Sequence, residues 1–218
     1  MSKTEIANSK VISPRVEDFY PAIEALTRGD VIVFPTETLY GLGADALNEA
    51  AVAKVLSLKG READNPISVL VANQSMLRSL VTDIPAAAQL LMNRYWPGPL
   101  TLVLPGRKDI PKPLSNPAGG IAVRISSQPI ATLLVRALGR PVTATSANPS
   151  GKEPARTLQE AKRYFVDQIH LYVDGGTLTS KSGSTVLEVM ENRFRIIREG
   201  EISAFELETV LGRERIQK

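Results

Sequence analysis

The chain of 218 residues contains no cysteine and a single histidine, His170. The absence of cysteine excludes disulfides, thiolate nucleophiles and cysteine-ligated zinc or iron–sulfur sites. One histidine argues against a histidine-rich metal site and against a Ser-His-Asp triad, and its place in the apolar stretch 169–173 favours a structural role. Any catalysis is therefore expected to rest on Lys, Arg, Ser and Thr side chains.

Long apolar segments are missing as well. No run of roughly 18 apolar residues occurs, and the first ten residues, MSKTEIANSK, lack the apolar core of a secretion signal. These absences predict a soluble, cytoplasmic protein without membrane contact. The formal charge of +3 is a mild excess, which favours phosphate-bearing ligands or RNA without establishing either.

Apolar spacing predicts an α/β fold in which helices alternate with strands early and strands cluster late. We expect a twisted, open, mixed β-sheet flanked by helices, forming a single domain over residues 14–212. Residues 1–13 are expected to be a flexible N-terminus and residues 213–218 a tail. The predicted helices are 14–27, 48–59, 75–80, 86–95, 129–138, 157–165 and 203–211, and the predicted strands 31–34, 67–71, 100–104, 121–125, 142–145, 171–173, 185–189 and 194–197.

The stretch VIVFPTETLYGLG, residues 31–43, concentrates polar groups at a strand end. Four apolar residues run into Pro35, which cannot donate to a sheet ladder, and the residues TET follow. The carboxyl ends of strands are where open α/β sheets hold ligands. The alternative is a polar turn in which Gly41 and Gly43 supply positive φ angles.

Three further groups carry charge or hydrogen-bonding capacity. Lys59 and Arg61 follow a predicted helix, where they could clamp a polyphosphate or merely complement the helix dipole. Residues 145–148, TSAN, could hold a nucleotide or form an ordinary turn. Arg124 interrupts an apolar strand and needs a partner or ligand, because a buried unpaired charge is costly.

Six motifs occur in one order across residues 35–200: PTETLYGLG, KGREADNP, AVRIS, TSANPSG, SGSTV and IIREG. Together they resemble the YrdC/Sua5 family, the threonylcarbamoyl-AMP synthases of tRNA modification, in its short, single-domain form. The chain departs from the family pattern at Ser126 and Glu62, where proline is usual or common. The resemblance implies a YrdC-like fold with a concave basic surface.

The resemblance also implies a reaction. L-threonine, bicarbonate or CO₂, and ATP would give threonylcarbamoyl-AMP and pyrophosphate, and a threonylcarbamoyl-transferase complex would then modify adenosine 37 of tRNA. Direct contact with tRNA is left open. Mg²⁺ would accompany ATP, held by phosphates and water rather than by protein ligands.

The resemblance assigns roles to residues of this chain. Lys59 and Arg61 would be catalytic, stabilising charge on the ATP phosphates as pyrophosphate leaves. The ATP site would further comprise Asn65, Ser146, Asn148 and Arg198. Threonine would be bound by Thr36, Ser68, Arg124 and Ser184, with Tyr40 as a pocket wall.

Two alternatives belong to other classes. A double-stranded RNA or tRNA-binding module without catalysis would show salt-dependent RNA affinity and no pyrophosphate release. The aromatic content of 5% and the lack of an RNP-like motif count against it. A carbamoyl-transfer domain acting on carbamoyl phosphate would ignore threonine.

Overall fold

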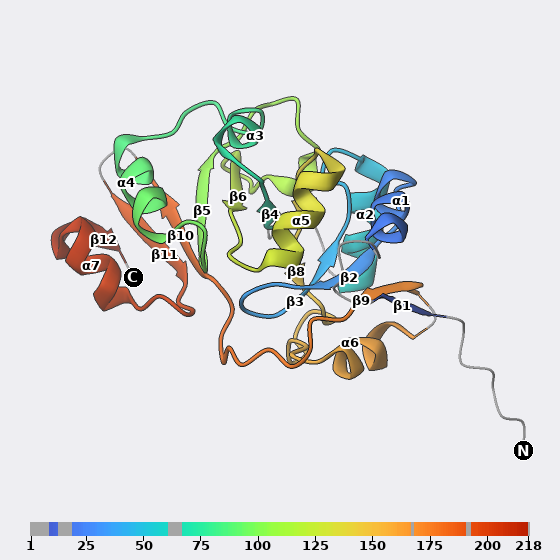
Figure 1. Ribbon diagram of the computed structural model, residues 1–218. Helices are drawn as coiled ribbons and strands as arrows, with labels where there is room; N and C mark the ends of the chain where they lie inside the picture. Colours follow the sequence, from blue (N-terminus) through green and yellow to red (C-terminus); the bar gives the residue numbers. More distant parts are fainter. Residues whose placement is uncertain (1–8, 13–18, 61–66, 167, 191–192, 218) are drawn as a thin grey trace, which may run out of the picture.

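The computed structural model describes residues 9–12, 19–60, 67–166, 168–190 and 193–217 (Figure 1). Strands and helices alternate early and strands cluster late, as the α/β prediction requires. The α-helices are α1 (Tyr20–Thr27), α2 (Glu49–Lys59), α3 (Gln74–Arg78), α4 (Ala86–Tyr95), α5 (Pro129–Leu138), α6 (Leu158–Phe165) and α7 (Ala204–Leu211), and the 3₁₀ helices are η2 (Lys112–Leu114) and η3 (Arg213–Arg215).

The strands form two mixed sheets where one was expected. The five-stranded sheet has the order β1 (Lys10–Ile12), β9 (Leu171–Val173), β2 (Ile32–Pro35), β3 (Tyr40–Gly43) and β8 (Thr145–Ser146). The seven-stranded sheet has the order β12 (Ile216–Gln217), β11 (Phe194–Arg198), β10 (Thr185–Val189), β5 (Leu100–Pro105), β6 (Gly120–Arg124), β4 (Val69–Leu70) and β7 (Val142–Thr143).

The segment after Pro35 turns back on itself in a β-hairpin. Strand β3 pairs antiparallel with β2, with Pro35 opposite Tyr40. Neither Gly41 nor Gly43 has a positive φ, so the alternative of a polar turn that needs positive φ at these glycines is wrong. A Cβ at Gly43 would lie 2.8 Å from Cε1 of Phe34. The hairpin therefore needs glycine at this position because the Phe34 ring packs against its backbone.

The predicted strand 142–145 is split between the sheets. Val142–Thr143 pairs with β4 in the seven-stranded sheet, whereas Thr145–Ser146 pairs with β3 in the five-stranded sheet. The chain thus passes from one sheet to the other at Ala144. A continuous run of strand-forming residues gives no local sign of such a switch.

Two strands lie in segments that were predicted to be a flexible terminus and a tail. Lys10–Ile12 pairs in parallel with β9, and Ile216–Gln217 pairs in parallel with β11. Both pairings join segments far apart in the chain, which local pattern cannot reveal. The described part of the predicted first helix begins at Tyr20, and residues 13–18 lie outside the described residues.

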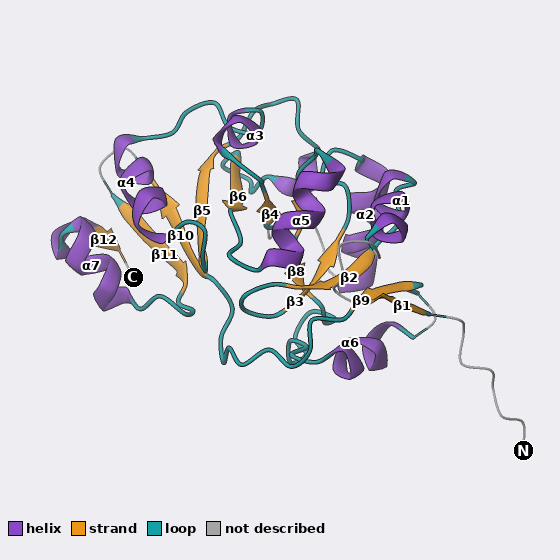
Figure 2. Ribbon diagram, viewed as in Figure 1, coloured by secondary structure: helices purple, strands orange, loops and turns teal. Residues whose placement is uncertain are grey.

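Helices pack around the strands (Figure 2). Helices α1 and α5 cover the five-stranded sheet through a buried cluster that includes Leu26, Phe34 and Leu134. A second cluster contains Leu42 of the five-stranded sheet and Leu102 of the seven-stranded sheet, so apolar packing joins the two sheets. In the described part of the chain, no helix combines the length and apolarity needed to cross a bilayer.

Candidate active site

A cleft of about 1040 Å³ is lined by residues of both sheets, from β3 and β8 on one side and from β6, β10 and β11 on the other. In Figure 1, β6 lies near the centre of the molecule, β10 and β11 lie to its left, and β3 and β8 lie to its lower right. Nine residues of the predicted site line the cleft: Thr36, Tyr40, Lys59, Ser68, Arg124, Ser146, Asn148, Ser184 and Arg198. The other two, Arg61 and Asn65, lie outside the described residues.

The charged side chains among the described lining residues are all cationic, although two of them pair with carboxylates outside the lining, Arg124 with Glu37 and Arg195 with Glu188. Four cationic side chains contribute to the lining, Lys59, Arg124, Arg195 and Arg198, and the described lining residues include no Asp or Glu. Serine and threonine hydroxyls and the amides of Asn116 and Asn148 supply the other polar groups. Such a surface suits a ligand that carries phosphates or a carboxylate.

Lys59 is the last residue of α2, and the helix ends there because Gly60 adopts the left-handed conformation at φ 58°. The Lys59 Nζ donates to the carbonyls of Ser146 at 2.8 Å and Asn148 at 2.6 Å, and to Asn148 Oδ1 at 3.2 Å. The residue is only 4% exposed. Its ammonium therefore fixes the loop 146–148 that was predicted to hold the nucleotide.

The side-chain amide of Asn148 also stabilises this loop. Its Nδ2 donates to the carbonyls of Pro149 and Lys152, at 3.0 and 2.6 Å, while its Oδ1 accepts from Lys59. The backbone N–H of Ser150 in turn donates to the Lys59 carbonyl at 2.8 Å. The TSANPSG turn is thus held to the end of α2 by both main chain and side chain.

Arg124, at the end of β6, is nearly inaccessible, with 4% of its side chain exposed. Its Nη1 donates to Glu37 Oε1 at 2.8 Å, and Ser126 Oγ donates to Glu37 Oε2. Burial lowers the pKa of Arg124 from its ordinary value, and the charge of Glu37 opposes this shift. The partner that the sequence required for Arg124 is therefore Glu37, 87 positions away in the chain.

Sequence reasoning assigned no role to Glu37 or Ser126. Glu37 was visible as a carboxylate at a strand end, and the charge at Arg124 called for a partner. Nothing local linked the two, because they belong to different sheets.

Thr36 and Tyr40 flank the turn of the β2–β3 hairpin. The Thr36 hydroxyl donates to the Leu39 carbonyl at 2.7 Å and accepts from the backbone N–H groups of Thr38 and Leu39. The Tyr40 hydroxyl donates to the Gly176 carbonyl at 2.7 Å and accepts from the N–H of Gly175 at 2.9 Å. Tyr40 thus ties the segment after β9 to the cleft, and burial raises its pKa to about 12.

Ser184 and Arg198 meet on the opposite side of the cleft. Arg198 Nη2 donates to the Ser184 carbonyl at 2.8 Å, and the Ser184 and Thr101 hydroxyls lie 2.8 Å apart. A Cβ at Gly183 would lie 3.1 Å from Arg198 Nη2, so the small residue allows the guanidinium to approach. A residue predicted to bind threonine and one predicted to bind ATP are therefore in direct contact.

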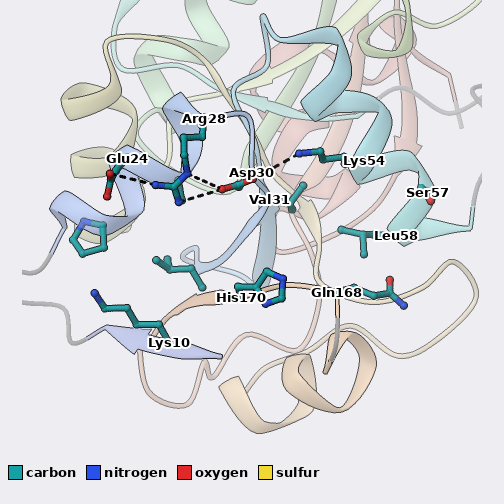
Figure 3. A pocket seen from close by; sticks show the side chains of 13 residues that line it. Lys10, Glu24, Arg28, Asp30, Val31, Lys54, Ser57, Leu58, Gln168 and His170 are labelled. Carbon is teal, nitrogen blue, oxygen red and sulfur yellow. Dashed lines mark hydrogen bonds and ion pairs between the residues drawn. The ribbon is translucent and has the colours of Figure 1, made fainter. Parts of the chain in front are cut away.

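A second cavity, of about 600 Å³, lies between α1, α2 and the start of β9 (Figure 3). His170 lines it and is exposed, just before β9 rather than within the strand. Two of its cations are paired, Arg28 with Glu24 and Asp30, and Lys54 with Asp30. It shares no lining residue with the cleft, so the nine described residues of the predicted site line the cleft and not this cavity.

A family model described as telomere recombination, which groups the Sua5, YciO and YrdC proteins, matches residues 24–200. The chain belongs to the Sua5/YciO/YrdC family. All six motifs that suggested this resemblance fall within or at the edge of the matched region.

Three relatives illustrate the relationship. The threonylcarbamoyl-AMP synthase of Pyrococcus abyssi is 38% identical over 207 residues, which cover 94% of this chain and 61% of that protein. The threonylcarbamoyl-AMP synthase of Marinobacter nauticus is 34% identical over 179 residues, covering 82% of this chain and 94% of that protein. The crystal structure of P. abyssi Sua5 complexed with L-threonine superimposes with a TM-score of 0.91 at 36% identity, covering 96% of this chain and 63% of that one. The chain thus spans about three fifths of the P. abyssi protein and nearly all of the Marinobacter one.

Proposed function

We propose that this protein is an L-threonylcarbamoyladenylate synthase, which forms threonylcarbamoyl-AMP and pyrophosphate from L-threonine, bicarbonate or CO₂, and ATP. The observation that carries the proposal is the cleft between the sheets. It combines four cations with hydroxyls and amides, and its described lining has no acidic side chain. The names of the relatives, and the L-threonine in the P. abyssi Sua5 crystal structure, support the same substrates.

The reaction consists of two steps that need charge neutralisation and alignment rather than a protein nucleophile. The neutral amine of threonine attacks CO₂, or bicarbonate with loss of water, and forms a carbamate. A carbamate oxygen then attacks the α-phosphate of ATP in line with the departing pyrophosphate. Holding the three reactants together supplies much of the rate enhancement, which accords with a chain that has one histidine and no cysteine.

We assign the threonine carboxylate to Arg124. Its Nε is buried and has no hydrogen-bond partner among the described residues, whereas its Nη1 is engaged by Glu37. A planar guanidinium binds a carboxylate through two parallel N–H bonds, and the edge that carries Nε is the one left for a ligand. Thr36, Ser68 and Ser184, which line the same cleft, would complete the threonine site, and Tyr40 would form a wall.

We assign the ATP phosphates to Lys59 and Arg61, and the rest of the nucleotide to Asn65, Ser146, Asn148 and Arg198. The contacts of Lys59 and Asn148 with the loop 146–148 support a preformed nucleotide site, since such a loop is already shaped before ATP arrives. The Arg198–Ser184 contact would place the nucleotide beside the threonine site.

Mg²⁺ would enter with ATP, bound by phosphate oxygens and water, and would neutralise charge on the leaving pyrophosphate. The donor set of the cleft fits this arrangement, because its described lining lacks carboxylates. In the described residues no cluster of three His, Cys, Asp or Glu side chains could hold a metal ion.

The product would serve a threonylcarbamoyl-transferase complex that modifies adenosine 37 of tRNA, and we place this activity in the cytoplasm, where ATP and tRNA are found. Two other functions weighed from the sequence, an RNA-binding module without catalysis and a carbamoyl-transfer domain, are not favoured. The relatives that match most of the chain are named as synthases.

The test is direct. Purified protein is incubated with ATP, Mg²⁺, bicarbonate and L-threonine, with L-serine in place of threonine as the control, and the products are analysed by mass spectrometry. We expect threonylcarbamoyl-AMP together with threonine-dependent pyrophosphate. Pyrophosphate release that ignores threonine, or none at all, would refute the proposed function.

A further inference from the structure

Among the described residues, the guanidinium of Arg124 has a hydrogen-bond partner on one side only. Its Nη1 donates to Glu37 at 2.8 Å, while its buried Nε has no partner among the described residues. A buried charged donor without a hydrogen-bond partner is costly. The orientation of the Nε edge therefore depends on the contact that Nη1 makes with Glu37 on the other side of the guanidinium. The residues that orient Arg124 therefore contribute to the binding of a ligand carboxylate together with Arg124 itself.

Glu37 provides that fixed side. Its side chain is 12% exposed and lies in the turn between β2 and β3, whereas Arg124 ends β6 of the other sheet. One carboxylate oxygen accepts from Arg124 and the other from Ser126. Thr36 and Thr38 on either side of Glu37 line the cleft, but Glu37 itself does not. Glu37 therefore acts on a ligand through Arg124, not by contact.

Ser126 determines where the Glu37 carboxylate lies. Its hydroxyl oxygen accepts the backbone N–H of Gln128 at 3.2 Å, and its single hydroxyl proton is donated to Glu37. Its carbonyl accepts from the Thr132 hydroxyl at 2.9 Å, which anchors the residue to the first turn of α5. Ser126 is 3% exposed, so water does not compete for these bonds.

We propose that Ser126 and Glu37 are positioning residues that aim the open edge of Arg124 at the ligand carboxylate, an inference that rests on the proposed function. The chain Ser126–Glu37–Arg124 runs from the start of α5, through the hairpin turn, to the cleft. A proline at position 126, as in the family pattern described above, has no hydroxyl and could not form it. This hydrogen-bonded arrangement therefore requires serine or threonine at position 126.

Kinetics of substitutions at Ser126 test the proposal. Ser126→Ala and Ser126→Pro are expected to raise KM for threonine by about 3- to 10-fold, with KM for ATP unchanged, because a hydrogen bond to a charged group is lost without a change at the nucleotide site. Ser126→Thr keeps the hydroxyl and is expected to retain the wild-type KM. The matched control is Ser127→Ala, since Ser127 is exposed and lies outside the cleft.

Glu37→Gln extends the test to the carboxylate. It keeps the shape but removes the charge that compensates Arg124, and we expect a rise in KM for threonine of about 10-fold or more. If this variant fails to fold, because a buried arginine then lacks its counter-ion, the Ser126 series decides alone. Wild-type KM for threonine in Ser126→Ala, or equal rises in KM for threonine and ATP, would overturn the proposal.

Calorimetric titration of L-threonine separates this inference from the proposed function. Weaker binding to Ser126→Ala than to the wild-type and Ser127→Ala proteins supports the positioning role, and equal binding overturns it. A wild-type protein that binds threonine but forms no adenylate refutes the proposed function alone. A wild-type protein that binds no threonine refutes both.

Discussion

At the scale of single residues, the two buried cations of the cleft are stabilised in different ways. Lys59 directs its ammonium at oxygen atoms of residues 146 and 148. Among the described residues, Arg124 has one carboxylate partner, Glu37, and its buried Nε has no hydrogen-bond partner. The acceptors in residues 146 and 148 are neutral, so they hold the Lys59 ammonium in place without bringing negative charge into the cleft. The pairing with Glu37 compensates the charge of Arg124 and fixes the direction of its guanidinium. Lys59 would thus contribute to ligand binding by shaping a loop, and Arg124 by presenting an oriented donor edge.

Tyr40 offers a prediction at the same scale. Burial raises its pKa from 10.0 to about 12, so the folded state retains a proton that the unfolded chain loses at lower pH. The resulting stability is complete below about pH 10 and is lost as the pH rises toward about 12. We expect Tyr40→Phe to lower the free energy of unfolding by about 1–3 kcal/mol near neutral pH, since Gly175 and Gly176 lose a partner. It should also lose less stability than the wild type above pH 10.

Urea denaturation at a series of pH values from about 8 to about 11.5 measures both effects. Tyr172→Phe is a suitable comparison, because burial also raises the pKa of Tyr172 to about 12 and its hydroxyl bonds to the Phe165 carbonyl away from the cleft. If Tyr40→Phe and the wild type lost the same free energy of unfolding above pH 10, the raised pKa of Tyr40 would not be a source of that loss.

At the scale of elements, the contact between the end of α2 and the loop after β8 shapes the proposed nucleotide site. The helix stops at Gly60, which brings Lys59 to the loop carbonyls. Because β8 also pairs with β3, the loop is fixed from two directions. A substitution at Lys59 is therefore expected to affect stability as well as catalysis.

Lys59→Met retains the apolar stem and removes the ammonium. It leaves the carbonyls of Ser146 and Asn148 without this donor, and we expect a loss of about 1–3 kcal/mol in the free energy of unfolding. Lys54→Met is the matched control on the same helix, since Lys54 is half exposed and its contacts in the described part of the chain are with the Gly29 carbonyl and the half-exposed Asp30. Its expected effect is within about 0.5 kcal/mol. Equal denaturation midpoints for the two variants would show that the ammonium does not hold the loop.

At the scale of the whole molecule, the sequence motifs and the family resemblance named residues of which nine share a cleft, but they gave no sign of what fixes these residues. Polar groups at the ends of apolar strands indicated a shared cleft, and nine of the predicted residues line it. The split of 142–145 between two sheets was not predictable, because both halves have strand-forming residues and the sheets separate only at Ala144. The pairing of Arg124 with Glu37 likewise depends on how two sheets pack, which no local pattern encodes.

Because both sheets line the cleft, a ligand bound there connects them, and binding should stabilise the molecule as a whole. L-threonine at about 100 times its dissociation constant is expected to stabilise the folded state by about 2.7 kcal/mol, which raises Tm by about 5–10 °C for a chain of this size. In Arg124→Lys the compact ammonium cannot form the two-bond fork with a carboxylate. We expect this variant to lose the threonine-dependent rise in Tm and to keep the rise produced by ATP and Mg²⁺.

Differential scanning fluorimetry with each ligand alone measures these shifts. Arg140→Lys is the matched control, because Arg140 is exposed, pairs with Asp45 and lies outside the cleft. A threonine-dependent rise in Tm of wild-type size in Arg124→Lys would contradict the assignment of the threonine carboxylate to Arg124. If Arg124→Lys lost the rise in Tm with threonine and also the rise with ATP and Mg²⁺, Arg124 would support the packing of the two sheets rather than one ligand. A contact with threonine alone would affect only the binding of threonine.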